Sequence, residues 1–138
     1  MVGILIVTHG KMASGLLNAV EMIIGKHENV AALELTEQDQ VEAFKQRIEQ
    51  ALDGVQGEDG AIVFVDMLGA TPFNLSARVA LERDDVEVIT GVNLPLLLEI
   101  IMQREHTPFE QLVAMAQEVG ADSIKILSQS LAAQDDES

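Results

Sequence analysis

The chain alternates short strand-like runs of hydrophobic residues with longer stretches in which hydrophobic residues recur at helical spacing. The strand-like runs occupy residues 3–8, 29–35, 61–66 and 86–90. The helical stretches, with hydrophobic residues three and four positions apart, occupy residues 13–24, 38–53, 71–82, 93–103 and 107–120. The runs at 3–8 and 61–66 are rich in Ile, Leu and Val without alternation until their last, polar residue, which is typical of strands buried on both faces of a parallel sheet.

Glycine and proline indicate where two of these helices end or begin. Gly25 is expected to end the first helix, since glycine readily adopts the left-handed conformation that often follows a helix. Thr71 is expected to cap the helix of residues 71–82, with Pro72 as its first helical residue, because proline fits the first turn.

Strands that alternate with helices predict an α/β fold with an open, mainly parallel sheet and right-handed crossovers. Helices on both faces would make three layers. Alternation does not determine the strand order, and we take the flavodoxin-like order 2-1-3-4 as the working prediction. Residues 1–130 are expected to form one domain.

The segment 123–129, "SIKILSQ", alternates Ile124 and Ile126 against Lys125 and predicts a half-exposed edge strand or an arm given to a partner. Residues 131–138 are expected to be a disordered acidic tail.

Composition narrows the functional classes. A chain of 138 residues, 48% hydrophobic, can bury a core in one domain. It contains no cysteine, which suits a reducing cytoplasm and excludes disulfides and thiolate sites. No export signal or membrane-spanning run is recognisable. A net charge of -15 disfavours nucleic acid and anionic membranes as partners and is compatible with basic protein partners.

Candidate chemistry lies at the ends of two predicted strands. His9 follows the first strand and Asp66 ends the third. In the order 2-1-3-4 these strands are neighbours at the switch point, where open parallel sheets bind ligands beyond their carboxyl ends. We therefore expect the two side chains to meet.

A carboxylate beside an imidazole fixes one ring nitrogen as a proton donor and leaves the other as a nucleophile or base. The helix that begins near Thr71 would offer backbone amides to an anion, Gly69 would let the backbone approach closely, and the Thr71 and Ser76 hydroxyls are candidate donors. Together these features favour a phosphoryl group on His9, with no metal or cofactor required.

Three segments carry a resemblance to a known family: "GILIVTHG" at 3–10, "FVDMLGATPFN" at 64–74 and "GVNLPLLLE" at 91–99. With them the chain resembles, over nearly its whole length, the mannose-family enzyme IIA domain of the bacterial phosphoenolpyruvate-dependent sugar phosphotransferase system.

The resemblance implies that His9 receives a phosphoryl group from the carrier protein HPr and passes it to a IIB component for sugar uptake. It implies that Asp66 holds the His9 ring. The loop residues matching the family's phosphate- and partner-binding region are Gly10, Gly69, Thr71, Pro72, Asn74 and Asn93. It also implies a homodimer that exchanges the final strand. The IIB component is expected on a separate chain. The resemblance assigns the choice of sugar to the membrane components and not to this domain.

Several alternatives stay open at this point. Without a IIB partner the domain would be a regulatory phosphoacceptor. A histidine phosphatase is a second alternative because "THG" resembles that superfamily's Arg-His-Gly, although Thr8 replaces the arginine. A receiver domain phosphorylated on Asp66 is a third, although such domains need acidic residues after the first strand. A non-enzymatic binding module is the fourth.

Overall fold

A computed structural model describes residues 1–137, with side chains described for residues 1–132. At its centre is a four-stranded sheet in which every neighbouring pair is parallel. The strands, in the spatial order β2-β1-β3-β4, are β2 (Val30–Leu35), β1 (Gly3–His9), β3 (Ala61–Val65) and β4 (Val86–Ile89). The predicted α/β class and the order 2-1-3-4 are confirmed.

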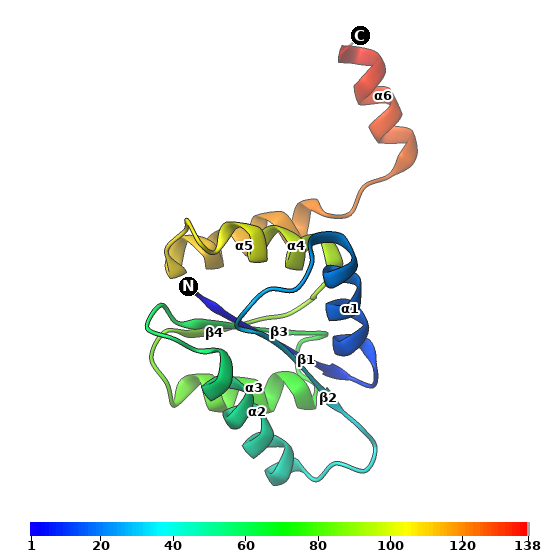
Figure 1. The fold of residues 1–138 in the computed structure, drawn as a ribbon. Coiled ribbons are helices and arrows are strands. Elements are labelled where there is room, and N and C mark those ends of the chain that lie inside the picture. Colours follow the sequence, from blue (N-terminus) through cyan, green and yellow to red (C-terminus); the bar gives the residue numbers. More distant parts are fainter. Residues whose placement is uncertain (138) are drawn as a thin grey trace.

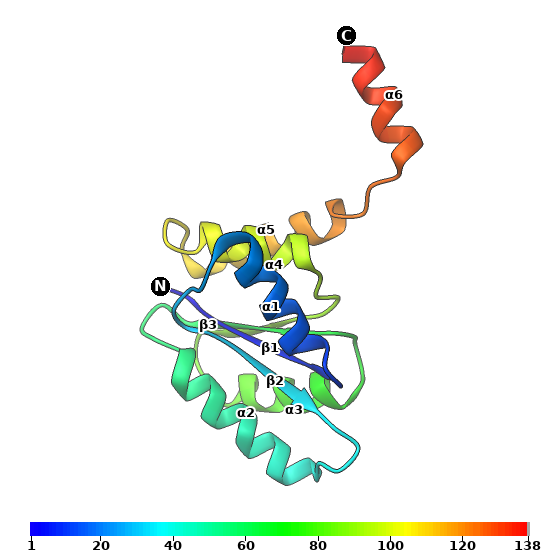
Figure 2. The ribbon, with the colours of Figure 1, turned by 45° about the vertical axis from the view of Figure 1, so that its right-hand side comes forward.

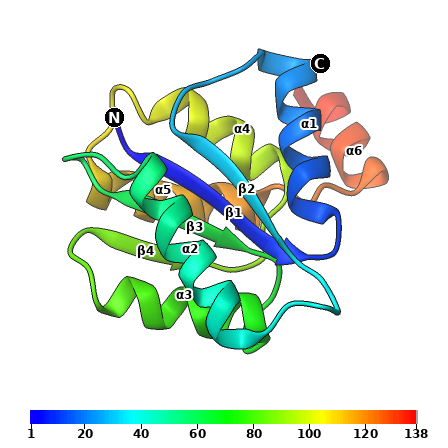
Figure 3. The ribbon, with the colours of Figure 1, turned by 60° about the horizontal axis from the view of Figure 1, so that its bottom comes forward.

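Helices cover both faces of the sheet. One face carries α1 (Met12–Ile24), α4 (Leu94–Gln103) and α5 (Phe109–Asp122). The other carries α2 (Val41–Val55) and α3 (Thr71–Leu81). Figure 1 shows these three layers from the side, and Figure 3 shows them with α2 and α3 turned toward the viewer.

The alternation of side chains along the strands divides the core into two clusters. In β1, Ile4 and Ile6 point into the cluster under α1, α4 and α5, whereas Leu5 and Val7 point into the cluster under α2 and α3. The strand is therefore apolar at every position from residue 4 to 7, because both of its faces are buried. The central strands β1 and β3 are thus firmly anchored, which fixes the positions of the residues at their ends.

The predicted helix boundaries need one correction at the candidate site. Gly25 is the C-cap of α1, as predicted. Thr71, however, is not the N-cap of α3: Ala70 holds that position with extended backbone, and Thr71 is already the first helical residue. The Thr-Pro pair lies one residue further into the helix than we expected, because proline is tolerated throughout the first turn.

The predicted edge strand at 123–129 is wrong for the single chain. After α5, residues 124–126 are irregular, and the chain continues as α6 (Leu127–Glu137), which projects away from the domain in Figures 1 and 2. A strand needs a neighbour for its backbone groups, and this segment reaches none in its own sheet. The tail expected at 131–138 is helical as far as Glu137, and Ser138 lies outside the described residues.

Within the described residues, no helix is long and apolar enough to cross a membrane.

Candidate active site

His9 and Asp66 meet at the carboxyl edge of the sheet, as the topology predicts. β1 ends at His9, and Asp66 directly follows the neighbouring strand β3. The His9 ring nitrogen Nδ1 lies 2.7 Å from Asp66 Oδ2, and the backbone N–H of His9 donates to the same oxygen at 2.9 Å. One carboxylate oxygen thus holds both the main chain and the ring of His9.

The hydrogen bonds determine which nitrogen of His9 is available. An ionised carboxylate can only accept, so His9 Nδ1 carries the proton in this contact, and in the neutral form of the ring the lone pair is on Nε2. The His9 side chain is 48% exposed, whereas that of Asp66 is only 14% exposed. The site therefore presents an oriented imidazole ring at an accessible surface.

The carboxylate of Asp66 is kept ionised by its surroundings. Burial by itself raises the pKa of Asp66, but hydrogen bonds from the His9 backbone and ring outweigh it, and the pKa lies below its ordinary value. The second oxygen, Oδ1, accepts the backbone N–H of Met67 at 3.0 Å. Both oxygens of Asp66 are thus engaged, which suits a fixed acceptor for His9.

The start of α1, close to His9, is already occupied by side chains. The hydroxyl of Thr8 accepts the backbone N–H of Ala13 at 2.8 Å. Glu34, at the end of β2, accepts the backbone N–H of Ser14 at 3.1 Å and its hydroxyl at 2.8 Å. A carboxylate therefore stands where an anion would bind this helix, and a phosphoryl group would be repelled there.

A side chain caps the start of α4, whereas the start of α3 has no such cap among the described residues. Asn93 caps α4, since its Oδ1 accepts the backbone N–H of Leu96 at 3.0 Å. Within residues 1–137, no side chain caps the first turn of α3. The positive end of α3, which follows the Asp66 loop, is thus the helix start near His9 that offers amides to an anion.

The structure places the remaining predicted loop residues around this edge. Gly10 and Gly69 adopt positive φ angles of 56° and 83°, so both turns use a conformation that favours glycine. Thr71 is partly exposed in the first turn of α3, and Pro72 beside it is buried. Pro72 thus serves packing at this helix start and has no N–H to offer an anion.

The side chains of the two predicted asparagines form hydrogen bonds with backbone carbonyls. The side-chain amide of Asn74 donates to the Gly69 carbonyl at 3.2 Å, and that of Asn93 donates to the Gly91 carbonyl at 3.3 Å. Ser76, considered as a donor, is fully buried and has no hydrogen-bond partner among the described residues. Ser76 is therefore not exposed at the surface where the His9 ring lies.

Sequence reasoning missed Thr8 and Glu34. In the sequence, Thr8 stands out only because it replaces an arginine, and Glu34 is one of 23 acidic residues. The parallel register pairs Thr8 with Glu34, which brings both to the start of α1. A hydroxyl residue before a histidine and an acidic residue near the end of the next strand were the available signals.

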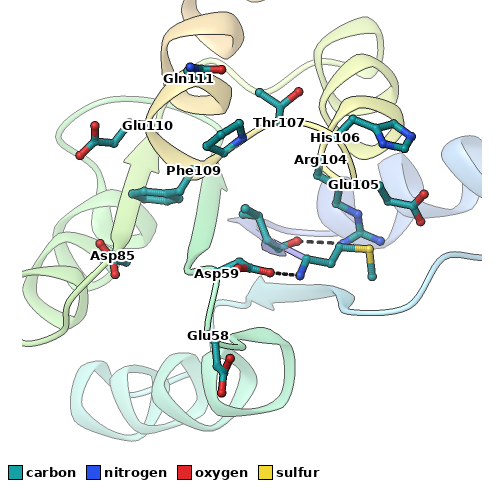
Figure 4. Close-up of a pocket in the computed structure, with 13 residues that line it drawn as sticks. Glu58, Asp59, Asp85, Arg104, Glu105, His106, Thr107, Phe109, Glu110 and Gln111 are labelled. Carbon is teal, nitrogen blue, oxygen red and sulfur yellow. Dashed lines mark hydrogen bonds and ion pairs between the residues drawn. The ribbon is translucent and has the colours of Figure 1, made fainter.

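A separate cavity of about 800 Å³ lies at the opposite, amino edge of the sheet and is shown in Figure 4. Arg104 and the carboxylates of Glu58, Asp59, Asp85, Glu105 and Glu110 are among the residues that line it. So many carboxylates repel a phosphoryl group, and neither His9 nor Asp66 belongs to the lining. This cavity is therefore not where the histidine chemistry would occur.

The family is decided by a match to the family model for the phosphotransferase system (PTS) fructose IIA component, which covers residues 3–117. The chain belongs to this IIA family. It is thus a IIA component of the sugar phosphotransferase system, and the resemblance in its three motifs is confirmed.

Two relatives show how this IIA component compares in length. It is 35% identical over 127 residues to the PTS system mannose-specific EIIAB component of Escherichia coli (strain K12), covering 91% of this chain but 39% of that protein. It is 28% identical to the PTS system fructose-specific EIIA component of Bacillus subtilis (strain 168), covering 95% of this chain and 90% of that one. The chain therefore spans about two fifths of the mannose-specific relative and most of the fructose-specific one.

The fold is also that of a solved IIA structure. The crystal structure of phosphotransferase system component EIIA from Streptococcus agalactiae superimposes with a TM-score of 0.86 at 26% identity, covering 94% of this chain and 99% of that one.

Proposed function

We propose that this IIA component accepts a phosphoryl group from phospho-HPr on Nε2 of His9 and passes it to a IIB component. The observation that carries the proposal is the short contact between His9 Nδ1 and Asp66, which leaves Nε2 with its lone pair on a half-exposed ring.

The transfer is written as a displacement at phosphorus. The Nε2 lone pair of His9 forms a new N–P bond while the N–P bond of the donor phosphohistidine breaks, and the donor nitrogen recovers its electron pair. The proton on Nδ1 stays between His9 and Asp66 throughout. The uncapped amides of α3 stabilise the equatorial phosphoryl oxygens. Transfer to IIB is the same displacement with His9 as the donor.

The surroundings of His9 suit a protein donor. Three large apolar side chains within three positions of His9 or Asp66 in the chain are exposed: Met12 (42%), Met67 (55%) and Leu68 (70%). Exposed apolar residues of this kind commonly mark a protein contact. The net charge of -15 would also attract a donor with a basic surface.

The alternatives fit the site less well. For phosphorylation on Asp66, both carboxylate oxygens are already engaged by backbone and ring donors. For a histidine phosphatase, the position before the histidine holds Thr8, whose hydroxyl is buried and hydrogen-bonded. A regulatory phosphoacceptor uses the same His9 chemistry and differs only in the protein that reads the phosphoryl group.

The test incubates the chain with labelled phosphoenolpyruvate, enzyme I and HPr. Wild type is expected to take up label, His9→Ala to take up none, and the matched variant His106→Ala to behave as wild type. Label that persists in His9→Ala would refute the assignment. Acid-labile, hydroxylamine-resistant label indicates phosphohistidine, whereas hydroxylamine-sensitive label would indicate Asp66.

A second variant tests the role of Asp66. Asp66→Asn keeps the shape of the side chain but removes the charge that fixes the ring, and the rate of label uptake is expected to fall about 100-fold or more. Asp85→Asn makes the same change at the amino edge, where Asp85 has a φ of 56° that asparagine tolerates, and is expected to leave the rate unchanged. Equal rates in the two variants would exclude the proposed role of Asp66.

We further propose that the chain forms a dimer through its C-terminal segment. The sheet order leaves one side of β4 without a neighbouring strand among the described residues. Beside β4 lies a groove of about 470 Å³, lined in part by Val88, Ile89, Leu96, Val113 and Ala116. An unpaired strand edge next to an apolar groove is a ready site for an added strand.

The C-terminal segment has the matching properties. Ile124, Ile126 and Leu127 are 83%, 54% and 75% exposed, and the segment leads away from its own sheet. Residues 123–129 of a second copy would add to β4 as a strand, with alternate side chains in the groove. The occupant is therefore this same segment, taken from the partner.

A further inference from the structure

The hydroxyl of Thr8 joins three parts of the site. Thr8 is completely buried at the end of β1. Its Oγ1 donates to the carbonyl of His9 at 3.2 Å and accepts the backbone N–H of Ala13 in the first turn of α1 at 2.8 Å. One hydroxyl thus connects the strand, the histidine and the helix that follows.

The turn between β1 and α1 has few other restraints. Gly10 has a φ of 56°, and the N-cap residue Lys11 makes no side-chain capping bond with any described residue. Thr8 therefore supplies, from before the turn, the capping oxygen that Lys11 does not provide. The backbone N–H of Gly10 donates to the carbonyl of Leu35 at 2.9 Å, which fixes the far side of the turn.

The polar groups of His9 are held from two directions. Asp66 accepts its backbone N–H and its Nδ1, and Thr8 donates to its carbonyl. Because the ring is 48% exposed, packing restrains it only in part, and these hydrogen bonds determine where Nε2 lies. Removing the Thr8 hydroxyl frees the carbonyl side of His9 while Asp66 still holds the other side.

We infer that Thr8 is a positioning residue for phosphoryl transfer at His9. It acts through the His9 main chain and does not touch the phosphoryl group. The inference rests on the proposed function, because the position of Nε2 matters only if Nε2 must lie in line with a donor phosphorus. A displacement of about 1 Å at such a centre costs on the order of 100-fold in rate.

Four proteins distinguish the effect of the Thr8 hydroxyl from that of its methyl group: wild type, Thr8→Val, Thr8→Ser and Thr8→Ala. Wild type and Thr8→Val both have a branched side chain, and Thr8→Ser and Thr8→Ala both lack the branch methyl. Within each pair the main difference is the hydroxyl. If Thr8→Val fails to fold, the serine and alanine variants still measure the hydroxyl.

The rate of label uptake at saturating phospho-HPr is the first measurement, taken well below the unfolding temperature. Thr8→Val and Thr8→Ala are expected to be about tenfold slower or more, with unchanged KM for the donor, and Thr8→Ser is expected to stay within about threefold of wild type. Wild-type rates in both hydroxyl-free variants, or an equal loss in Thr8→Ser and Thr8→Ala, would overturn the inference.

The second measurement is independent of the donor. Imidazole ¹⁵N spectra are expected to show the Nδ1–H tautomer of His9 in all four proteins, because Asp66 still accepts from Nδ1. The Nδ1 and Nε2 resonances of Thr8→Val and Thr8→Ala are expected to be displaced from those that wild type and Thr8→Ser share. An unchanged spectrum in both hydroxyl-free variants would overturn the inference. If wild type takes up no label but the spectra change as stated, the proposed function fails while the positioning of His9 by Thr8 stands.

Discussion

At the residue scale, the central feature is that Asp66 binds His9 twice through one oxygen. The backbone bond places the end of β1, and the ring bond orients the imidazole. Since the ring bond uses the proton on Nδ1, the carboxylate that locates the residue also leaves Nε2 as the nucleophile of the proposed transfer. Nε2 is therefore the nitrogen that we expect to find phosphorylated.

The lowered pKa of Asp66 predicts a pH dependence of stability. A carboxylate with a folded pKa below its unfolded value of about 4 stabilises the fold above that value, and this contribution is lost as the pH falls through the folded pKa. In urea unfolding, wild type is expected to exceed Asp66→Asn in free energy of unfolding at pH 7, by a margin that shrinks at pH 3.

His9→Ala is the control for this pH dependence, because it removes the ring bond and keeps the backbone bond to Asp66. Its margin over His9→Ala/Asp66→Asn is expected to vary less between pH 7 and pH 3 than the margin of wild type over Asp66→Asn. A wild-type margin of the same size at both pH values would contradict the assignment.

Arg104 is the other residue whose surroundings allow a sharp prediction. It is 3% exposed, and its guanidinium donates to the carbonyls of Val2, Glu28 and Asn29 at the amino edge of the sheet, partly visible in Figure 4. Burial lowers the pKa of Arg104, with Glu105 and Glu28 acting in the opposite direction. The residue joins the starts of β1 and β2 to the end of α4.

Arg104→Met is expected to cost roughly 3–5 kcal/mol of unfolding free energy, because it leaves one buried and two partly buried carbonyls without their donor. Arg78→Met is the matched control: Arg78 is exposed and 3.8 Å from Glu42, so its loss is expected to cost about 0.5 kcal/mol or less. Urea unfolding measures both, and similar values for the two variants would show that the carbonyl bonds of Arg104 contribute little.

At the element scale, β1 and β3 carry the two reactive residues to one edge, and the turn after β1 directs the chain into α1. Gly10 makes this turn with a positive φ, whereas Gly15 lies within α1 itself. A Cβ at either position would meet no atom within 4 Å. The two glycines therefore differ in backbone conformation and not in available space.

Alanine at these two glycines is expected to change stability in opposite directions. Gly10→Ala should lose roughly 1–2 kcal/mol through left-handed strain. Gly15→Ala should gain roughly 0.5–1 kcal/mol, because alanine favours the helix interior. Urea or thermal unfolding of both variants makes the comparison, and a stabilising Gly10→Ala would contradict the strain argument.

At the scale of the whole molecule, the two edges of the sheet have different chemistry. The carboxyl edge holds His9, Asp66 and the uncapped start of α3, while the amino edge holds the acidic cavity and the buried Arg104. Beyond α5, the C-terminal segment projects away from the domain (Figure 2). Two isoleucines of this segment, Ile124 and Ile126, are exposed and available to a second copy of the chain.

The proposed dimer predicts a mass in solution of twice the chain for wild type, measured by size-exclusion chromatography with light scattering. Ile126→Asp places a charge on the segment that would enter the groove and is expected to give a single-chain mass. Leu81→Asp, an equally polar change at an 88% exposed residue of α3, is expected to remain dimeric. A wild type with the mass of one chain would contradict the dimer.

Most of the fold was predictable because its signals are local. Both faces of β1 and β3 are buried, so their sequences are apolar throughout residues 4–7 and 61–65, and most of the helices follow from hydrophobic spacing. The pairing of His9 with Asp66 was also accessible, since parallel strands in the order 2-1-3-4 bring their carboxyl ends together.

The contacts of Thr8 and Glu34 and the course of the C-terminal segment could be seen only in the folded chain. Thr8 and Glu34 meet through strand register, which no local pattern encodes, and together they occupy first-turn amides of α1. No described side chain caps α3. The alternation in residues 123–129 describes a strand, but a strand forms only where another backbone accepts its hydrogen bonds. Local patterning therefore specified the central strands and the first five helices, while long-range contacts decided the strand order that joins His9 to Asp66, which helix starts are capped, and the form of residues 124–137.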